Sequence, residues 1–367
     1  MKLVLVAGAR PNFMKIAPLM WELARRPDAT SFLVHTGQHY DEKMSKLFFD
    51  QLKIPKPNVD LEVGSGSHAI QTAEVMRRFE PVLLAQHPDA VVVVGDVNST
   101  IACALTAVKI GIPVAHVEAG LRSFDWTMPE EINRVLTDAI SRWLFVSEPS
   151  GLENLRREGV AAGRIYHVGN VMIDTLIACR NQFEQAGMLR EFGNERGSYA
   201  VLTMHRPANV DDPIILRAVL GALEIIQREI PVVFPVHPRT RKALMGERLD
   251  LPNLRLTDPL GYLEFMNLVA QARFVMTDSG GIQEETTFLG VPCLTLRNNT
   301  ERPATVETGT NVLVGLDPEK IVNQARLAMK DRPAERRIPE FWDGMASRRI
   351  LDILLDGDSM GGVIGAG

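Results

Sequence analysis

A Ser-Gly-Gly segment near residue 280 has the residue types of an anion-binding site. It lies in Thr277–Glu285, whose sequence is Thr-Asp-Ser-Gly-Gly-Ile-Gln-Glu-Glu, and it follows the apolar run Phe274–Met276. Glycines at a strand-to-helix junction let the backbone approach a ligand, and the first N–H groups of the helix can bind phosphate. Glu285, about one helical turn beyond Gly281, shares that face. The segment predicts a nucleotide site, with Ser279, Gly280 and Gly281 at a diphosphate and Glu285 at ribose hydroxyls; the alternative is an ordinary turn.

Charged and titratable side chains follow several other apolar runs. They are Arg10 and Lys15 after the first run, Asp96 after Ala90–Val94, Glu118 after Val114–Val117, His205 after Ala200–Thr203, and Arg302 after the run ending at Leu296. Ligands of open parallel sheets bind at the carboxyl ends of the strands, so we expect these groups to line a site. Each alone has a structural alternative, such as a helix cap for Asp96 or a first-turn position for Glu130 and Glu131. Their joint occurrence favours function.

The apolar runs also predict the fold. Ten of them alternate with helical patterns, at Leu3–Ala7, Ser31–Thr36, Ala90–Val94, Val114–Val117, Leu144–Val146, Ala200–Thr203, Val232–Val236, Leu254–Thr257, Phe274–Met276 and Cys293–Leu296. Continuous apolar runs suit strands buried on both faces, hence parallel sheets covered by helices. At 367 residues the chain exceeds one comfortable core. We therefore predict two doubly wound α/β domains, with the linker in Arg190–Ser198.

Composition limits the partners. The formal net charge is −5, from 40 basic and 45 acidic residues, and no Lys/Arg block is present, which argues against nucleic acid. No apolar run approaches the length of a membrane span. Cys103, Cys179 and Cys293 lie far apart without metal-ligand spacing, in apolar surroundings typical of buried thiols in a reducing compartment. We expect a cytoplasmic protein with a small-molecule substrate, and no metal or other cofactor.

Taken in order, the motifs resemble the non-hydrolysing UDP-N-acetylglucosamine 2-epimerase family over about residues 1 to 350. They are Gly8–Asn12 with Lys15, Thr36–His39, Gly95-Asp96, His116–Arg122, Pro129–Arg134, His205-Arg206, Asp278–Glu285 and Thr300–Pro303. The resemblance implies a glycosyltransferase-B-type architecture of two Rossmann-like domains facing across a cleft. It places the first domain at 1–170, completed by a C-terminal helix at 341–356, and the UDP-binding domain at 171–340. Residues 357–367 are expected to form a disordered tail. Family members are commonly homodimers.

The resemblance also implies a reaction and the residues for it. UDP leaves C1 and a proton leaves C2 to give 2-acetamidoglucal, and UDP then adds back after protonation from the other face. Asp96, Glu118 and Glu130 match the catalytic carboxylates, with the proton-abstracting one left open, and His205 matches the essential histidine near the diphosphate. Arg10, Ser279, Gly280, Gly281 and Arg302 would hold the diphosphate, Glu285 the ribose and the Phe265 backbone the uracil, with Lys15 beside the site.

Two positions depart from the family pattern, and three other functions stay open. Ala208 replaces a frequent glutamate and Leu260 replaces a glutamine of some members, so peripheral contacts are in doubt.

A hydrolysing epimerase would release UDP and N-acetylmannosamine. A glycosyltransferase would need an acceptor groove and gives no reason for three carboxylates. A nucleotide-sugar sensor would not need Asp96, Glu118, Glu130 and His205 together.

Overall fold

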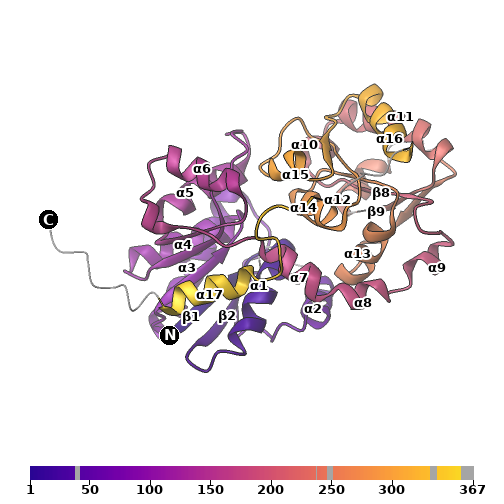
Figure 1. Ribbon diagram of the computed structural model, residues 1–367. Coiled ribbons are helices and arrows are strands. Elements are labelled where there is room, and N and C mark those ends of the chain that lie inside the picture. Colours follow the sequence, from indigo (N-terminus) through magenta and orange to yellow (C-terminus); the bar gives the residue numbers. More distant parts are fainter. Residues whose placement is uncertain (38–41, 237, 246–250, 331–336, 357–367) are drawn as a thin grey trace. The chain divides into compact units, whose positions relative to one another are not determined.

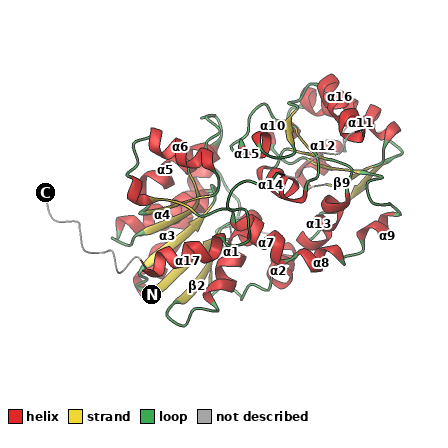
Figure 2. Ribbon diagram, in the orientation of Figure 1, coloured by secondary structure: helices red, strands yellow, loops and turns green. Residues whose placement is uncertain are grey.

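The computed structural model describes residues 1–37, 42–236, 238–245, 251–330 and 337–356, with backbone only for Arg10, residues 42–46 and residues 238–239. The chain forms two compact units. One comprises Met1–Ala178 with the segment from Glu340 onward, and the other comprises Cys179–Pro339. Each unit contains one parallel sheet flanked by helices (Figures 1 and 2), which confirms the predicted α/β class with two Rossmann-like sheets. The expected tail at 357–367 lies outside the described residues.

The first unit is built on a seven-stranded sheet in the order β3-β2-β1-β4-β5-β6-β7, with all neighbouring strands parallel. The strands are β1 Lys2–Ala7, β2 Thr30–His35, β3 Val59–Asp60, β4 Ala90–Val94, β5 Val114–Ala119, β6 Trp143–Val146 and β7 Ile165–His167. From β1 the chain adds β2 and β3 on one side, and it then adds β4 to β7 on the other side of β1. The reversal between β1 and β4 is a topological switch point, where such sheets bind ligands.

The helices of the first unit form two groups. Helix α1 contacts α7 and α17, whereas α3 contacts α4, which in turn contacts α5. Right-handed crossovers explain the division, because the connections leaving β1 and β4 cross the sheet in opposite directions and so cover opposite faces. The helices are α1 Arg10–Leu23, α2 Glu42–Gln51, α3 His68–Gln86, α4 Asn98–Lys109, α5 Pro129–Ile140, α6 Pro149–Arg157, α7 Val171–Ala178 and α17 Ala346–Asp356, with a short 3-10 turn at Ala162–Arg164.

The second unit repeats the plan with a six-stranded parallel sheet in the order β10-β9-β8-β11-β12-β13. Its strands are β8 Ala200–Thr203, β9 Val232–Pro235, β10 Leu254–Thr257, β11 Val275–Thr277, β12 Cys293–Thr295 and β13 Asn311–Leu313. Its helices are α8 Arg180–Glu184, α9 Met188–Phe192, α10 Pro207–Val210, α11 Pro213–Glu229, α12 Pro238–Leu244, α13 Tyr262–Gln271, α14 Gly280–Leu289, α15 Ala304–Glu307 and α16 Pro318–Lys330. The switch point of this sheet lies between β8 and β11.

Ten predicted strands are confirmed, and three further strands occur. Most of the confirmed strands are apolar runs that fill the core, as in Ala90–Val94, all of whose residues are buried. The edge strand β10 is confirmed as well, although none of its residues is buried. The additional strands β3, β7 and β13 are edge strands of two or three residues that are mostly not buried. An edge strand of that length does not need an apolar run, so its sequence carries little signal.

The C-terminal helix begins later than predicted. The expected helix at 341–356 is observed as α17, Ala346–Asp356, beside α1 (Figure 1). Phe341 and Gly344 have φ of 60° and 84°, which no right-handed helix accommodates. Asp174 then accepts hydrogen bonds from the N–H groups of Ala346 (3.2 Å) and Ser347 (2.7 Å), so its carboxylate marks the start of the helix.

The predicted linker lies inside the second unit. The units divide between Ala178 and Cys179, not near Arg190–Ser198 or at 170, because α7 packs on α1 and α17 while α8 and α9 pack on α13. Asn267 of α13 joins these helices by accepting from Met188 N–H (3.1 Å) and donating to the Phe183 carbonyl (2.7 Å). Both Phe183 and Met188 are buried, so the segment just before this polar stretch is anchored to the second unit by apolar contacts.

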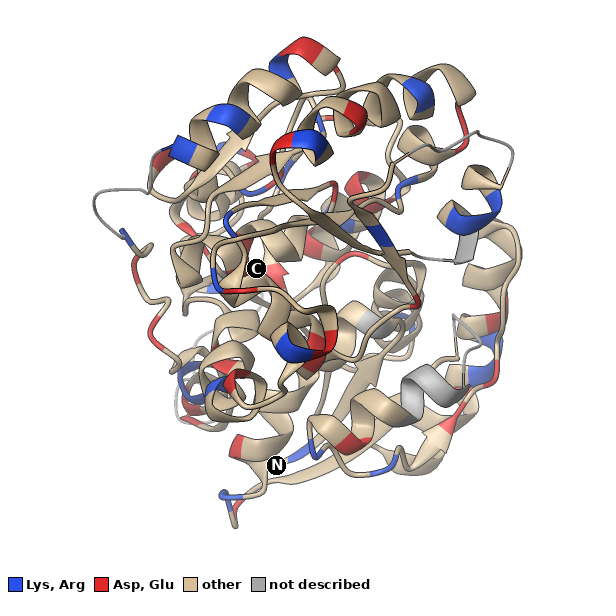
Figure 3. Ribbon diagram, turned by 90° about the vertical axis from the view of Figure 1, so that its right-hand side faces the viewer, with Lys and Arg blue, Asp and Glu red and all other residues tan. Residues whose placement is uncertain are grey.

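The charged residues and the cysteines lie where the composition indicates. Figure 3 shows acidic and basic residues interleaved along the helices that it displays. Cys103, Cys179 and Cys293 are buried free thiols, as predicted. Within the described ranges, no helix has the length and apolarity needed to cross a membrane.

Candidate functional site

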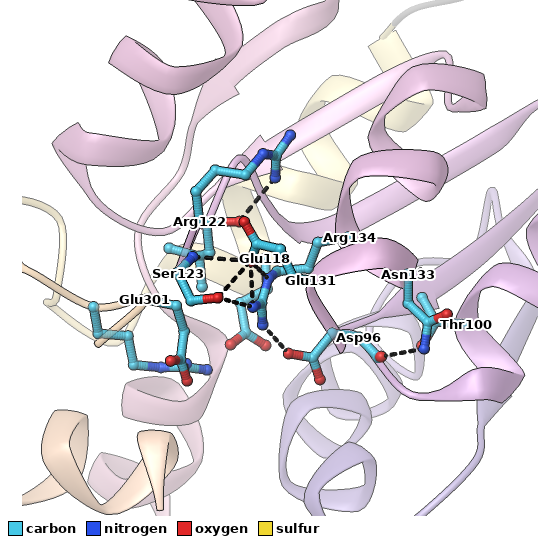
Figure 4. A network of polar contacts seen from close by, with 12 residues as sticks. Asp96, Thr100, Glu118, Arg122, Ser123, Glu131, Asn133, Arg134 and Glu301 are labelled. Carbon is cyan, nitrogen blue, oxygen red and sulfur yellow. Dashed lines mark hydrogen bonds and ion pairs between the residues drawn. The ribbon is translucent and has the colours of Figure 1, made fainter. Parts of the chain in front are cut away.

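Asp96 lies at the carboxyl end of β4 and is held by α5. Its carboxylate pairs with the Arg134 guanidinium at 2.5 Å, and its carbonyl accepts a hydrogen bond from the Asn133 side chain at 2.9 Å (Figure 4). Arg134 is buried, whereas the Asp96 side chain is 24% exposed. The carboxylate is therefore oriented by a fixed cation and still accessible. This arrangement suits a group that acts on a bound molecule.

The two adjacent glutamates of α5 have different environments. Glu131 is buried and accepts hydrogen bonds from the Ser123 N–H (2.8 Å) and the Phe124 N–H (2.9 Å), and it pairs with Arg134 at 2.6 Å (Figure 4). Burial by itself raises the pKa of Glu131, but the Ser123 hydrogen bond and Arg134 outweigh it and lower the pKa. Glu130 is half-buried, and within the described part of the chain its carboxylate makes no ion pair. Glu131 therefore holds the Ser123–Phe124 turn, whereas Glu130 has no such contact among the described residues.

Glu118 has an unusual backbone conformation. It lies in β5 at a register shift between Val117 and Ala119, and its φ of 77° is in the region that favours glycine. Such a bulge redirects a side chain, and strained residues of this kind gather at functional sites. The buried Glu118 carboxylate forms an ion pair with Lys15 of α1. The expected lysine thus lies beside one of the expected carboxylates.

Gly95 gives this ion pair its space. A Cβ atom at Gly95 would lie 2.7 Å from Lys15 Nζ and 3.6 Å from Glu118 Oε2, and the residue has a φ of 66°. A side chain here would be strained and would displace the lysine. The strand ends are in register, since Val94 of β4 pairs with Val117 of β5. Asp96 and Glu118 therefore lie at neighbouring strand ends, next to the switch point.

In the second unit, His205 is fixed by Asp278. The carboxylate of Asp278 is buried at the end of β11, and it accepts hydrogen bonds from the N–H groups of His205 (2.9 Å) and Arg206 (2.8 Å). It also pairs with His205 Nδ1 at 2.8 Å. Burial by itself raises the pKa of Asp278, but the charge and hydrogen bonds of His205 and the Arg206 N–H lower it to about 2. The ring, 49% exposed, is thus anchored through Nδ1–H.

Helix α14 begins with the predicted anion-binding segment. Ser279 is its N-cap residue, and Gly280 and Gly281 open the helix, where the first N–H groups have no intrahelical partner. A Cβ atom at Gly280 would lie 2.6 Å from Arg302 Nη1 and 2.5 Å from Glu301 Oε1. The glycine therefore admits the Arg302 guanidinium to the helix N-terminus. Fixed cations and N–H groups at one position are what a diphosphate requires.

Two buried glutamates that sequence reasoning did not assign to the site hold Arg302. Glu301 Oε1 contacts Arg302 Nη1 at 2.6 Å, and Glu284 Oε1 contacts Arg302 Nε at 2.9 Å. Arg297 pairs with the second oxygen of Glu301 at 2.6 Å. Burial by itself raises the pKa of Glu301, but Arg302, Arg297 and Arg206 lower it well below its usual value. Both glutamates occur in the motifs, but the contact between Glu284 and Arg302 joins two separate motifs, which spacing does not reveal.

Glu285 is buried in an environment that disfavours its charge. Burial raises the pKa of Glu285 to about 8, the nearby Tyr262 hydroxyl of α13 partly offsets this rise, and the Glu284 carboxylate raises the pKa further. The Oε1 atom of Glu285 has no hydrogen-bond partner among the described residues. A buried acceptor without a partner suits a ligand hydroxyl, which is the predicted ribose role.

The remaining predicted residues are placed less fully. Phe265 is half-buried in α13, and its N–H already donates to the Gly261 carbonyl at 3.0 Å, so a uracil contact would need another group of the residue. Arg10 is the first residue of α1, and its side chain lies outside the described part. The Gln38-His39 pair of the motif also lies outside the described residues.

The predicted residues therefore form two groups, each at the carboxyl ends of strands. Lys15, Asp96, Glu118 and Glu130 belong to the first unit, and His205, Ser279, Gly280, Gly281, Glu285 and Arg302 to the second. The first group contains carboxylates that could act as acids or bases, and a cation. The second contains groups that could donate hydrogen bonds to an anion, and a carboxylate that could accept one from a hydroxyl group. No three His, Cys, Asp or Glu side chains of the described ranges are grouped to hold a metal ion.

Comparisons with known proteins agree with this chemistry. A family model described as UDP-N-acetylglucosamine 2-epimerase matches residues 21–355. A Methanococcus maripaludis protein named UDP-N-acetylglucosamine 2-epimerase homolog is 46% identical over 362 residues, covering 96% of this chain and 99% of that protein. A UDP-2,3-diacetamido-2,3-dideoxy-D-glucuronate 2-epimerase of Pseudomonas aeruginosa is 41% identical, covering 96% and 99%. The crystal structure of Methanocaldococcus jannaschii UDP-GlcNAc 2-epimerase with UDP-GlcNAc and UDP is 41% identical, with a TM-score of 0.90 and coverage of 96% and 99%.

Proposed function

The chain belongs to the UDP-N-acetylglucosamine 2-epimerase family, and on this premise we propose that it interconverts UDP-N-acetylglucosamine and UDP-N-acetylmannosamine without net hydrolysis. The observation that carries the proposal is the pair of carboxylates, Asp96 and Glu118, at neighbouring ends of β4 and β5. Glu118 is paired with Lys15 of α1, and Asp96 is paired with Arg134 of α5. Inversion at C2 needs acid and base groups held in place in this way.

The proposed reaction proceeds by elimination and re-addition. The C1–O bond to UDP breaks with its electron pair going to the diphosphate, and the C2 proton passes to a carboxylate. The product is 2-acetamidoglucal. A second group then protonates C2 from the opposite face while UDP adds back to C1. The addition is the chemical reverse of the elimination, so no oxidant or reductant is consumed. We propose Asp96, Glu118 and Glu130 as the groups that transfer the protons.

The second unit is proposed to stabilise the departing UDP. Negative charge develops on the diphosphate as the C1–O bond breaks, and Arg302 and the N–H groups at Gly280 and Gly281 are already oriented for an anion. His205, held by Asp278, adds a further donor. Preorganised donors of this kind stabilise the transition state without reorganisation at the moment of reaction. Glu285 would accept from the ribose.

The sugar is the finer part of the proposal. The Pseudomonas aeruginosa relative acts on a different UDP-sugar at nearly the same identity as that of the Methanocaldococcus jannaschii enzyme structure. Purified protein should therefore be incubated separately with UDP-N-acetylglucosamine and with UDP-2,3-diacetamido-2,3-dideoxyglucuronate. Formation of UDP-N-acetylmannosamine supports the proposal. If only the uronate is turned over, the substrate is that sugar and not UDP-N-acetylglucosamine. If UDP and free N-acetylmannosamine are released, the enzyme is a hydrolysing one.

We further propose a cytoplasmic homodimer whose product supplies surface polysaccharide precursors. The three buried free thiols fit a reducing compartment, and a nucleotide sugar is the activated form that polymer synthesis consumes. Light scattering on a gel-filtration column would give the mass in solution. A single monomeric species at working concentration would contradict the dimer.

A further inference from the structure

A buried histidine and a buried aspartate link the turns that lie next to Asp96 and Glu118. His116 of β5 is fully buried, and both of its ring nitrogens have partners. Its Nε2 lies 2.9 Å from the Gly95 carbonyl oxygen, and its Nδ1 lies 2.6 Å from Asp138 Oδ1 of α5. A carbonyl oxygen and a carboxylate oxygen only accept, so each ring nitrogen donates a hydrogen.

Asp138 continues the link to the other side of the ring. Its Oδ2 accepts from the Gly120 N–H at 3.0 Å and pairs with Arg122 at 2.7 Å. Burial by itself raises the pKa of Asp138, but the His116 and Arg122 charges outweigh it and lower the pKa, which keeps the carboxylate ionised. Arg122 in turn holds Glu158 through two hydrogen bonds of 2.8 and 2.7 Å. The charges thus alternate in sign and offset one another, from the buried Asp138 and Arg122 to Glu158, whose side chain is 37% exposed.

The two anchored glycines lie next to the proposed catalytic groups. Gly95 immediately precedes Asp96, and Gly120 follows Glu118 by two residues. Both glycines have positive φ, 66° and 81°, so each marks a sharp change of chain direction that does not follow from regular strand geometry. The Gly95 carbonyl and the Gly120 N–H are joined through the His116 ring and the Asp138 carboxylate, and this link fixes the two turns relative to each other.

We propose that His116 and Asp138 are positioning residues that set the relative placement of Asp96 and Glu118. This inference rests on the proposed function for its effect on turnover, because both side chains are buried. Displacement of a reacting group by about 1 Å costs roughly 100-fold in rate. Loss of the anchor should therefore lower kcat and leave the anchoring of UDP, which is assigned to the second unit, unchanged.

The chain offers a matched control. His35 of β2 is also a buried histidine that pairs through Nδ1 with an aspartate, Asp60, at 2.8 Å. It lies on the far side of β1 from β5, and among the described residues its ring contacts Asp60, Phe13 and Phe49 and neither Gly95 nor Gly120. Substitution of His35 removes a histidine–aspartate pair from the same sheet without releasing either anchored glycine.

The test uses amide side chains that mimic one ring nitrogen each. In His116→Asn the amide can replace Nδ1 and keep the Asp138 contact while the Gly95 carbonyl is released; in His116→Gln the amide can replace Nε2 and keep the Gly95 contact. We expect kcat to fall roughly 100-fold in His116→Asn and less in His116→Gln, with UDP affinity unchanged, while His35→Asn keeps kcat within about twofold. Folded His116→Asn protein with wild-type kcat would overturn the inference.

Two further measurements keep the inference separate from the proposed function and from folding. In the wild type, ¹⁵N NMR of the histidine ring should show hydrogens on both nitrogens of His116, and a neutral ring would overturn the inference even if no epimerisation were found. If His116→Asn does not fold, Asp138→Asn tests the same link from the Gly120 side. In a crystal structure of either folded variant, unchanged positions of Asp96 and Glu118 would contradict the positioning role.

Discussion

At the scale of single residues, Glu118 is the most constrained of the proposed catalytic groups. A non-glycine residue with a φ of 77° costs on the order of 1–3 kcal/mol, which the surrounding structure must offset. The ion pair with Lys15 and the open space at Gly95 are what keep the side chain in this position. The strained backbone directs the Glu118 carboxylate to the end of the strand, whereas regular strand geometry in β5 would leave it on a face of the sheet. Such a cost is understandable if the carboxylate acts in the reaction.

The three carboxylates should affect turnover and not UDP binding. Asp96→Asn, Glu118→Gln and Glu130→Gln each remove a proton-transfer group, and we expect kcat to fall by roughly 100-fold to 10,000-fold. UDP affinity, measured by calorimetry, should stay near the wild-type value because the anion-binding residues are untouched. Glu153→Gln, which loses only an exposed ion pair with Arg157, is the control. Near-normal turnover in any one variant would remove that residue from the catalytic set.

Glu285 should make the ligand-free protein less stable as the pH rises. Its pKa is about 8 in the folded protein and about 4.3 in an unfolded chain. Between these values the unfolded chain releases the proton and the folded protein keeps it, so the free energy of unfolding falls by up to about 1.4 kcal/mol per pH unit and then levels off. Urea unfolding across this interval should show Glu285→Gln gaining stability relative to the wild type. Parallel pH profiles for the two proteins would exclude a neutral Glu285.

At the scale of elements, the N-terminus of α14 joins the backbone donors to Arg302. Gly280→Ala would place a methyl group 2.6 Å from Arg302 Nη1, so the guanidinium must move away from the helix N-terminus. We expect UDP to bind roughly tenfold more weakly, since a charge-assisted contact is worth about 1.5–3 kcal/mol. In the control Gly221→Ala, no atom lies within 4 Å of the new methyl, and α11 should be slightly stabilised. Equal UDP affinity in both variants would contradict the assigned site.

Sequence predicted the elements because apolar runs and turn glycines are local signals. The strands through Ala90–Val94 and Ala200–Thr203 are found where expected, and so is the helix that begins at Gly280. The start of α17 was placed too early, because the caps from Asp174 reach across 172 residues. The linker was misplaced because polar composition at Arg190–Ser198 says nothing of the Asn267 contacts that bind its neighbours to α13.

The site was predicted as residue types, and its supporting contacts were not. Asp96 follows β4 and Glu118 lies near the end of β5, so strand ends reveal them, whereas the Ser-Gly-Gly motif that precedes it reveals Glu285 in α14. The distinction between Glu130 and Glu131 depends on Ser123 and Phe124, which contact one of two adjacent glutamates. The His116–Asp138 contact joins a strand to a helix 22 residues later, and no periodicity links those positions.

At the scale of the whole molecule, the chemistry is divided between two units. The first carries the proposed acids and bases, and the second carries the proposed anchors for the diphosphate and ribose. This division predicts that substitutions separate by unit into effects on turnover and effects on nucleotide affinity. It also explains why two copies of one fold are useful to this reaction, since each switch point supplies one of the two kinds of group.

The proposed elimination is tested most directly by incubating the protein with UDP-N-acetylglucosamine in deuterium oxide and recovering the UDP-sugars. If the C2 proton leaves and a solvent proton returns, deuterium appears at C2 of UDP-N-acetylmannosamine and, through the reverse reaction, of UDP-N-acetylglucosamine. The Glu153→Gln control should label equally, and the Asp96→Asn, Glu118→Gln and Glu130→Gln variants far less. UDP-N-acetylmannosamine formed without deuterium at C2, or UDP-N-acetylglucosamine recovered unchanged, would contradict the account.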